Sequence, residues 1–96
     1  MARLSEHQRS EALAGLSGWT YQQDRAGIAK SFTFADFNEA FGFMARVALA
    51  SEKADHHPNW SNVWNRVDIL LTTHSEDGLT AKDIALALKI EAIART

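Results

Sequence analysis

Residues 51–60 read SEKADHHPNW, and this stretch decides where a long central helix ends and extended chain begins. It holds two adjacent histidines, His56 and His57, followed by Pro58, the only proline in the chain. Proline disfavours helical geometry at the residue before it, so the helix must end at this point. Adjacent helical residues point about 100° apart, but once released from the helix both imidazoles can turn toward one cleft.

Upstream of this stretch, two rows of apolar residues run along the predicted central helix. We expect Thr33 to cap this helix, with Asp36 at its third position, and the helix to run to about Lys53. One row holds Phe37, Phe41, Met44 and Ala48, and the other holds Ala40, Phe43, Val47 and Ala50. Because a surface helix normally has one apolar face, we expect one row to pack on a sheet and the other to meet a partner subunit. The alternative is a helix covered on both sides within one chain.

The N-terminal third predicts a helix and a β-hairpin. Ser5 and Gln8 have the spacing of a capping box, so a short helix should follow and end near Gly15 or Gly18. Residues 19–24, WTYQQD, suit a strand, and residues 24–27, DRAG, are a turn signal. Apolar and small residues then alternate over residues 28–34, which predicts the second strand of the hairpin.

The C-terminal third predicts extended chain and a last helix. Residues 62–73 read as one bent strand or as two short strands hinged near Asn65. Thr80 and Asp83 form a second capping-box pattern, which opens a helix that runs to about Arg95. The order of elements predicts an α+β fold, with helices on one face of an antiparallel sheet.

Length and composition exclude several classes of protein. We expect 96 residues to form one domain. The formal net charge of −2 argues against direct nucleic-acid binding, which needs a basic surface. No cysteine is present, so disulfides and thiolate chemistry are excluded. We see no secretory signal and no apolar run long enough for a membrane span, so we expect a cytoplasmic protein with no membrane association.

Three histidines form the candidate site. His56 and His57 lie beside two carboxylates, Glu52 and Asp55, and His74 can approach them from the end of the last strand. Each histidine also has a structural interpretation, as a partner of the helix dipole, a loop residue or a solvated strand end. Asp83 is likewise explained by the capping box alone.

Tryptophan is abundant for so short a chain. Trp19, Trp60 and Trp64 can either stack on a flat heteroaromatic ligand or anchor a core or an interface. For Trp60 we favour a place in the core or at an interface.

Two chemistries suit these histidines. Histidine gains and loses a proton near neutral pH, so one ring can donate a proton while another accepts one, as the elimination of water requires. The alternative is a metal site with three histidine ligands. Adjacent histidines converge poorly on a metal, and we rank the metal site second.

The spacing of these residues resembles the pterin-4a-carbinolamine dehydratase family. The matching elements are Glu52, three intervening residues, His56, His57 and Pro58, then the aromatic Trp64, the later histidine His74 and the aspartate Asp83. The similarity extends through residues 32–60 and residues 78–87 and is looser in the N-terminal helix. The aromatic at position 64 is often tyrosine in this family, so Trp64 can change the shape of the pocket.

The resemblance implies an α-β-β-α-β-β-α fold with a four-stranded sheet, in homodimers or homotetramers. It also implies dehydration of 4a-hydroxytetrahydropterin to quinonoid dihydropterin, a hydro-lyase reaction of tetrahydrobiopterin recycling that needs no metal and no bound cofactor. His57 is then the expected acid, with His56 and His74 acting as base or holding the pterin. The other residues expected at the substrate are Glu52, Asp55, Pro58, Trp19, Trp64 and Asp83.

Some relatives in this family also act as dimerisation cofactors for a transcription factor. The resemblance therefore implies a second function, in which the helical face binds a protein partner. In a eukaryote such a protein would also enter the nucleus.

Overall fold

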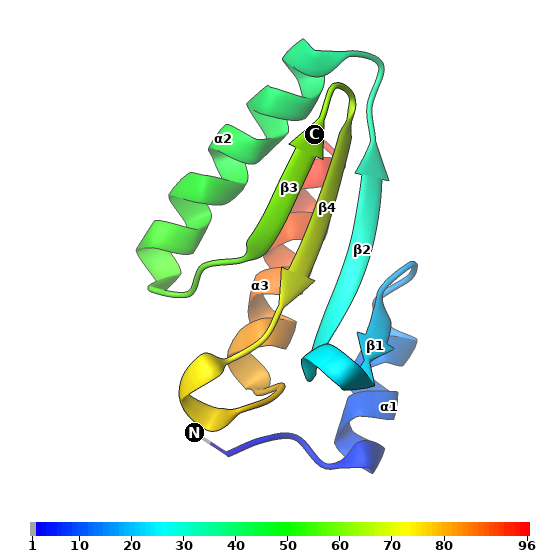
Figure 1. Ribbon diagram of the computed structural model, residues 1–96, viewed down its shortest axis with the longest axis vertical. Helices are drawn as coiled ribbons and strands as arrows, with labels where there is room; N and C mark the ends of the chain where they lie inside the picture. The colour runs from blue at the N-terminus through cyan, green and yellow to red at the C-terminus, as the bar shows by residue number, and fades with distance from the viewer. Residues whose placement is uncertain (1) are drawn as a thin grey trace.

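The computed structural model describes residues 2–96, which form three α-helices, four strands and two short 3-10 helices. The helices are α1 (Glu6–Ala14), α2 (Phe37–Ala54) and α3 (Ala81–Ala94), with η1 (Gln23–Arg25) and η2 (His74–Glu76). The strands are β1 (Thr20–Gln22), β2 (Gly27–Thr33), β3 (Asn59–Val63) and β4 (Arg66–Leu71). Figure 1 shows α2 and α3 running along the sheet, with α1 beside β1.

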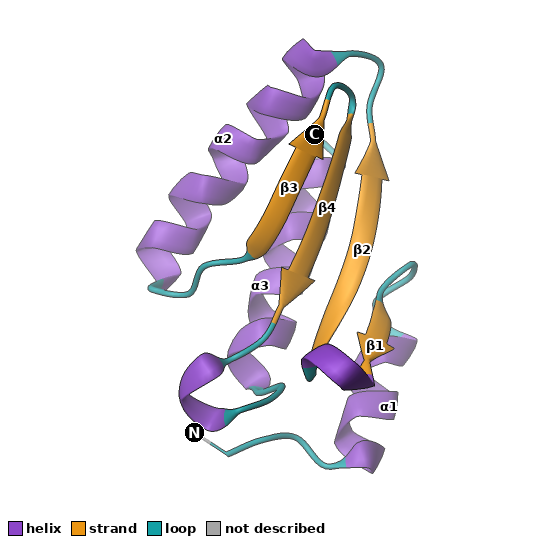
Figure 2. Ribbon diagram, in the orientation of Figure 1, coloured by secondary structure: helices purple, strands orange, loops and turns teal. Residues whose placement is uncertain are grey.

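The strands form one antiparallel sheet in the order β1-β2-β4-β3 (Figure 2). Side chains on one face of β2 and β4 are buried against the helices, and these are Ile28, Phe32, Val67, Ile69 and Leu71. Phe43 and Val47 of α2 and Ile90 of α3 meet them in one core. The predicted α+β fold, with three helices on one face of a four-stranded antiparallel sheet, is confirmed.

Both predicted capping boxes are present. The Ser5 hydroxyl accepts from the Gln8 backbone N–H, and the Gln8 side-chain oxygen accepts from the Ser5 backbone N–H. Thr80 and Asp83 form the same pattern at the start of α3. Local sequence therefore determines where α1 and α3 begin.

The prediction for the start of α2 was wrong. Asp36, and not Thr33, is the N-cap, and its carboxylate accepts from the Glu39 backbone N–H at 2.8 Å. Thr33 is instead the last residue of β2, where it pairs with Arg66 of β4. Pairing with a distant strand therefore prevailed over a local capping pattern.

The segment after Pro58 forms a tight hairpin. The chain reverses at Trp64, which has a φ of 49°, and Asn65, so the expected hinge near Asn65 is a full turn between two strands. The first of these strands begins at Asn59 and not at Asn62 as predicted. This edge strand alternates between exposed and half-buried side chains, which is a weaker pattern than that of the central β4.

The two apolar rows of α2 have different environments. Ala40, Phe43 and Val47 are fully buried, which confirms that one row packs inside the chain, although Ala50 is only half-buried. The other row is largely open to solvent, with Phe37 and Phe41 48% and 57% exposed and their rings 5.7 Å apart. Within residues 2–96, no helix has both the length and the apolar character that a membrane span requires.

Candidate active site

A fully buried carboxylate organises one end of the molecule. Asp83, in the first turn of α3, has no exposed surface. Its Oδ1 lies 2.6 Å from His56 Nε2, and its Oδ2 accepts from the Thr73 hydroxyl at 2.8 Å and the Thr80 backbone N–H at 2.9 Å. Asp83 thus caps α3, as predicted, and also holds side chains from two other segments.

The end of α2 directs His56 toward α3. Asp55 takes a left-handed conformation, with φ 53°, and the backbone N–H of His56 donates a hydrogen bond to the Ser51 carbonyl. The chain therefore leaves the helix one residue before the histidine pair. Since an ionised carboxylate only accepts hydrogen bonds, His56 donates its Nε2–H to Asp83. The His56 side chain is 11% exposed and borders a hollow between the end of α2 and α3.

His57 lies on the opposite, solvent side of this turn. Its Nε2 is 2.8 Å from Oε1 of Glu52, and the two side chains are 56% and 82% exposed. Glu52 therefore orients the His57 ring while leaving the other ring nitrogen open to solvent. From the sequence we expected Glu52 to lie beside the histidine pair, and in the structure it is within hydrogen-bond distance of His57.

His74 differs slightly from its expected position. It is not a strand residue but the first residue of η2, and it is exposed. Thr73, just before it, pairs with Gly78 through two backbone hydrogen bonds of 3.0 and 3.3 Å. Residues 74–77 thus form a closed loop at the end of β4.

The strand register brings these segments to one end of the sheet. Asn59, the first residue of β3, pairs with Leu70, which is near the end of β4. Figure 1 shows that the chain enters β3 at the same end of the sheet at which it leaves β4. Residues 55–57 precede β3, and Thr72 and His74 follow β4. The sequence separates the histidine pair from His74 by a whole hairpin, and pairing of β3 with β4 brings the two segments to the same end of the sheet.

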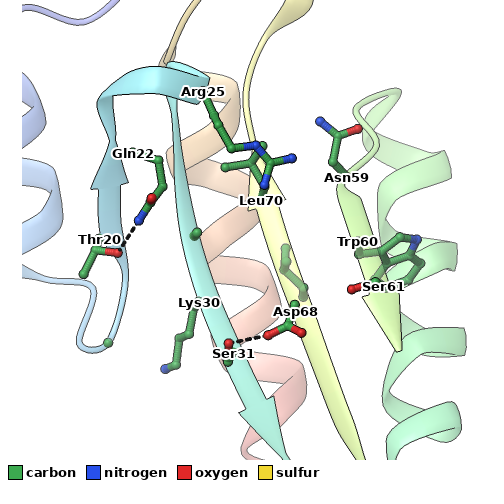
Figure 3. Close-up of a pocket in the computed structure, with 13 residues that line it drawn as sticks. Thr20, Gln22, Arg25, Lys30, Ser31, Asn59, Trp60, Ser61, Asp68 and Leu70 are labelled. Carbon is green, nitrogen blue, oxygen red and sulfur yellow. Dashed lines mark hydrogen bonds between the residues drawn. The ribbon is translucent and has the colours of Figure 1, made fainter. Parts of the chain in front are cut away.

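A hollow on the open face of the sheet leads to His74. A cavity of about 270 Å³ is lined by Arg25, Ala26, Asn59, Leu70, Thr72, His74 and Asp77. It shares Arg25, Asn59 and Leu70 with a larger cavity of about 540 Å³ (Figure 3). Small-molecule sites typically occupy roughly 300–1,000 Å³, so the joined hollow has a suitable size. Neither of these two cavities is lined by His56 or His57.

The larger cavity contains a charged group. Asp68 accepts a hydrogen bond from the Ser31 hydroxyl, and Arg66 Nε lies 3.0 Å from its carboxylate. The bond from Ser31 and then the Arg66 guanidinium lower the pKa of Asp68 below its ordinary value, against the opposing effect of burial. Asp68 is therefore a carboxylate at neutral pH.

Two of the predicted aromatic residues lie elsewhere. Trp19 is buried in the core, where its indole N–H donates to Glu91 and its ring meets Phe32 edge to face. Trp64 is 63% exposed at the hairpin turn, at the far end of β3 from His57. In this single chain, neither ring lines the two cavities at the sheet face.

Sequence reasoning missed several polar residues around the histidines. Arg25 and Asn59 line the hollow that reaches His74, and the Thr73 hydroxyl donates to Asp83. Their separation in sequence gives no local signal, although Asn59 follows the histidine pair closely. Among residues 2–96, no group of three or more histidine, aspartate and glutamate side chains is placed to hold a metal ion.

Comparison with known proteins identifies the family of this chain. The family model for pterin 4 alpha carbinolamine dehydratase matches residues 2–93. Relatives named "Putative pterin-4-alpha-carbinolamine dehydratase" include one from Rhizorhabdus wittichii, 58% identical over 95% of this chain and 94% of its own length. Another, from Nitrobacter hamburgensis, is 57% identical over 97% of this chain and 92% of its own length.

Two solved structures share the fold. A transcriptional coactivator/pterin dehydratase from Brucella melitensis has a TM-score of 0.93 and 54% identity, covering 96% of this chain and 98% of that one. A pterin dehydratase-like protein identified as a RuBisCO assembly factor in the alpha-carboxysome has a TM-score of 0.71 and 26% identity, covering 80% and 89%. The match over nearly the whole length, together with the fold, shows that the chain belongs to the pterin 4 alpha carbinolamine dehydratase family.

Proposed function

We propose that the protein dehydrates 4a-hydroxytetrahydropterin to quinonoid dihydropterin and water. The C4a–O bond breaks as the hydroxyl takes up a proton, and N5 loses a proton as the C4a=N5 double bond forms. His57 donates the first proton and His74 accepts the second. The protein thus requires two groups that exchange protons near neutral pH and no electron acceptor.

One observation carries this proposal: two exposed histidines, His57 and His74, come from different segments to the same end of the sheet, and His74 lines a hollow there. Glu52 holds the His57 ring through one nitrogen and leaves the other available for proton transfer. His56 has a different part, because its Nε2–H is engaged by the buried Asp83. We assign His56 to orientation of the loop and the bound pterin.

The reaction places the protein after an aromatic hydroxylation that leaves a hydroxyl group on C4a of its pterin cofactor. We therefore propose a role in tetrahydrobiopterin recycling, in the cytoplasm. Pro58, half-buried between His57 and Asn59, fixes the backbone that borders the substrate. Asp55 shapes the same turn, and in an oligomer the exposed Trp64 completes the pterin contacts.

The purified protein is expected to accelerate the absorbance decay of a freshly generated 4a-carbinolamine. Addition of a chelator should leave the rate unchanged, because proton transfer by imidazole needs no metal. The measurement is a stopped-flow assay with the hydroxylated pterin generated in situ, with and without chelator. A rate equal to that of buffer would contradict the proposal, and loss of the acceleration in chelator would favour the three-histidine metal site.

We also propose that the exposed row of α2 joins subunits. Phe41→Glu should shift the protein toward monomers in analytical ultracentrifugation, because a buried charge at an apolar contact is costly. Leu88→Glu, which changes a similarly exposed residue of α3, serves as the matched control and should leave the assembly unchanged. A wild-type protein that sediments as a monomer at all concentrations would refute this assignment.

The same exposed row supports a second function, binding of a protein partner through the helices. The Brucella melitensis relative is named as a coactivator as well as a dehydratase, and the carboxysome relative as an assembly factor. A variant that lacks His56, His57 and His74 distinguishes the two functions. Binding of a partner that survives in this variant, in a protein without dehydratase activity, would favour the second function.

A further inference from the structure

The Thr73 hydroxyl connects the loop that carries His74 to the buried carboxylate beneath it. Thr73 is 7% exposed, and its backbone N–H and carbonyl both bond to Gly78, which closes the loop of residues 74–77. Its hydroxyl oxygen lies 2.8 Å from Asp83 Oδ2 and 2.8 Å from Thr80 Oγ1. The residue next to His74 is thus fixed through its backbone on one side and its side chain on the other.

The direction of these hydrogen bonds follows from the carboxylate. Asp83 can only accept, so the Thr73 hydroxyl donates its one proton to Oδ2. The Thr80 hydroxyl must then donate to Thr73, and it accepts in turn from the Lys82 backbone N–H at 3.3 Å. The chain of donors runs from the first turn of α3, through both threonines, to Asp83.

Asp83 holds the two halves of the candidate site at once. His56 binds Oδ1 of Asp83 and Thr73 binds Oδ2. The two oxygens belong to one planar carboxylate, so this group sets the spacing between the turn that carries His56 and His57 and the loop that carries His74. The carboxylate is itself held by the start of α3, because Oδ2 also accepts from the Thr80 backbone N–H. A shift of either segment would break a buried hydrogen bond.

We propose that Thr73 is a positioning residue, whose hydroxyl holds His74 at the distance from the His56–His57 turn that dehydration requires. This inference rests on the proposed function. A misplacement of about 1 Å at a reacting group can lower a rate by about 100-fold, so a single buried hydroxyl can have a measurable effect on turnover.

The test compares Thr73→Val, which has nearly the same shape without the hydroxyl, with Thr73→Ser, which keeps it. Thr73→Val should lower kcat about tenfold or more with a smaller change in KM, and Thr73→Ser should stay within about twofold of the wild type. Ser51→Ala is the matched control, because among the described residues the buried Ser51 hydroxyl has no hydrogen-bond partner. It should leave kcat unchanged.

A second readout does not depend on activity. In proton–nitrogen correlation NMR spectra of the imidazole rings, Thr73→Val should broaden or split the His74 signals, while Thr73→Ser and Ser51→Ala keep the wild-type spectrum. If the wild type lacks dehydratase activity, the proposed function fails, but these spectra still report whether Thr73 holds the loop. An unchanged His74 signal in Thr73→Val, with wild-type kcat, would overturn the inference.

A third test uses the wild-type protein and requires no substitution. A hydroxyl proton donated to a buried carboxylate is shielded from water, so the Thr73 hydroxyl should give a slowly exchanging NMR signal at neutral pH. A hydroxyl proton that exchanges too fast to be detected would show that the bond to Asp83 is not maintained, and would also overturn the inference.

Discussion

Replacing Asp83 by alanine should lower the free energy of unfolding by about 3–5 kcal/mol, the usual cost of removing one partner from a buried polar pair. Without the carboxylate, which has no exposed surface, the His56 ring N–H, the Thr73 hydroxyl and the Thr80 backbone N–H all lose their acceptor. Each kcal/mol shifts the Tm of a domain this size by about 4–8 °C, so a fall of about 12 °C or more is expected.

Asp36→Ala is the matched control for this measurement. Asp36 also caps a helix, α2, but it is exposed, and within residues 2–96 its carboxylate accepts only from the Glu39 backbone N–H. Loss of such a cap costs about 1 kcal/mol, so the difference between the two variants isolates the buried network from the capping effect. Both should be measured by urea denaturation at one protein concentration, since assembly shifts apparent stability. Equal losses in the two variants would show that the network adds nothing beyond capping.

Asp83→Asn separates charge from shape at the same position. One amide oxygen can still accept from Thr73 and Thr80, but the amide nitrogen then faces His56 and is a donor. His56 must then present an unprotonated Nε2, so its proton moves to Nδ1. The variant should fold, lose less stability than Asp83→Ala, and show the other tautomer of His56 by NMR.

The elements that local sequence determines were predictable. Both capping boxes involve residues three apart, and Pro58 acts on the residue before it, so no distant contact is needed to set these boundaries. The start of α2 could not be predicted in this way. Thr33 satisfies a capping pattern, but its pairing with Arg66 across the sheet keeps it in β2.

The candidate site was only partly visible in the sequence, for a related reason. Glu52 and His57 lie five residues apart on one turn, and their pairing follows from local geometry. The bond between Thr73 and Asp83 depends on how β4 ends above α3, which the sequence pattern does not specify. Trp19 shows the opposite case, since an aromatic expected at the substrate lies in the core of the single chain and donates to Glu91.

Removing either proposed proton-transfer group should reduce turnover without unfolding the protein. We expect His57→Ala and His74→Ala each to lower kcat by about 10²–10⁴-fold, the usual contribution of one general acid or base. Both side chains are exposed, so their removal leaves no cavity in the core. His7→Ala is the matched control, because His7 is also exposed and also lies near a glutamate, Glu11, at 3.4 Å. It should keep full activity.

Added imidazole distinguishes proton transfer from a structural role in these variants. A small imidazole can enter an exposed site from which a histidine ring has been removed and take over its proton transfer. The kcat of His57→Ala and His74→Ala should therefore rise with imidazole concentration. His56→Ala should not recover, because its ring orients the loop through Asp83 and is largely buried. If His57→Ala and His74→Ala both keep the wild-type rate, or if imidazole rescues only His56→Ala, the assignment of acid and base is wrong.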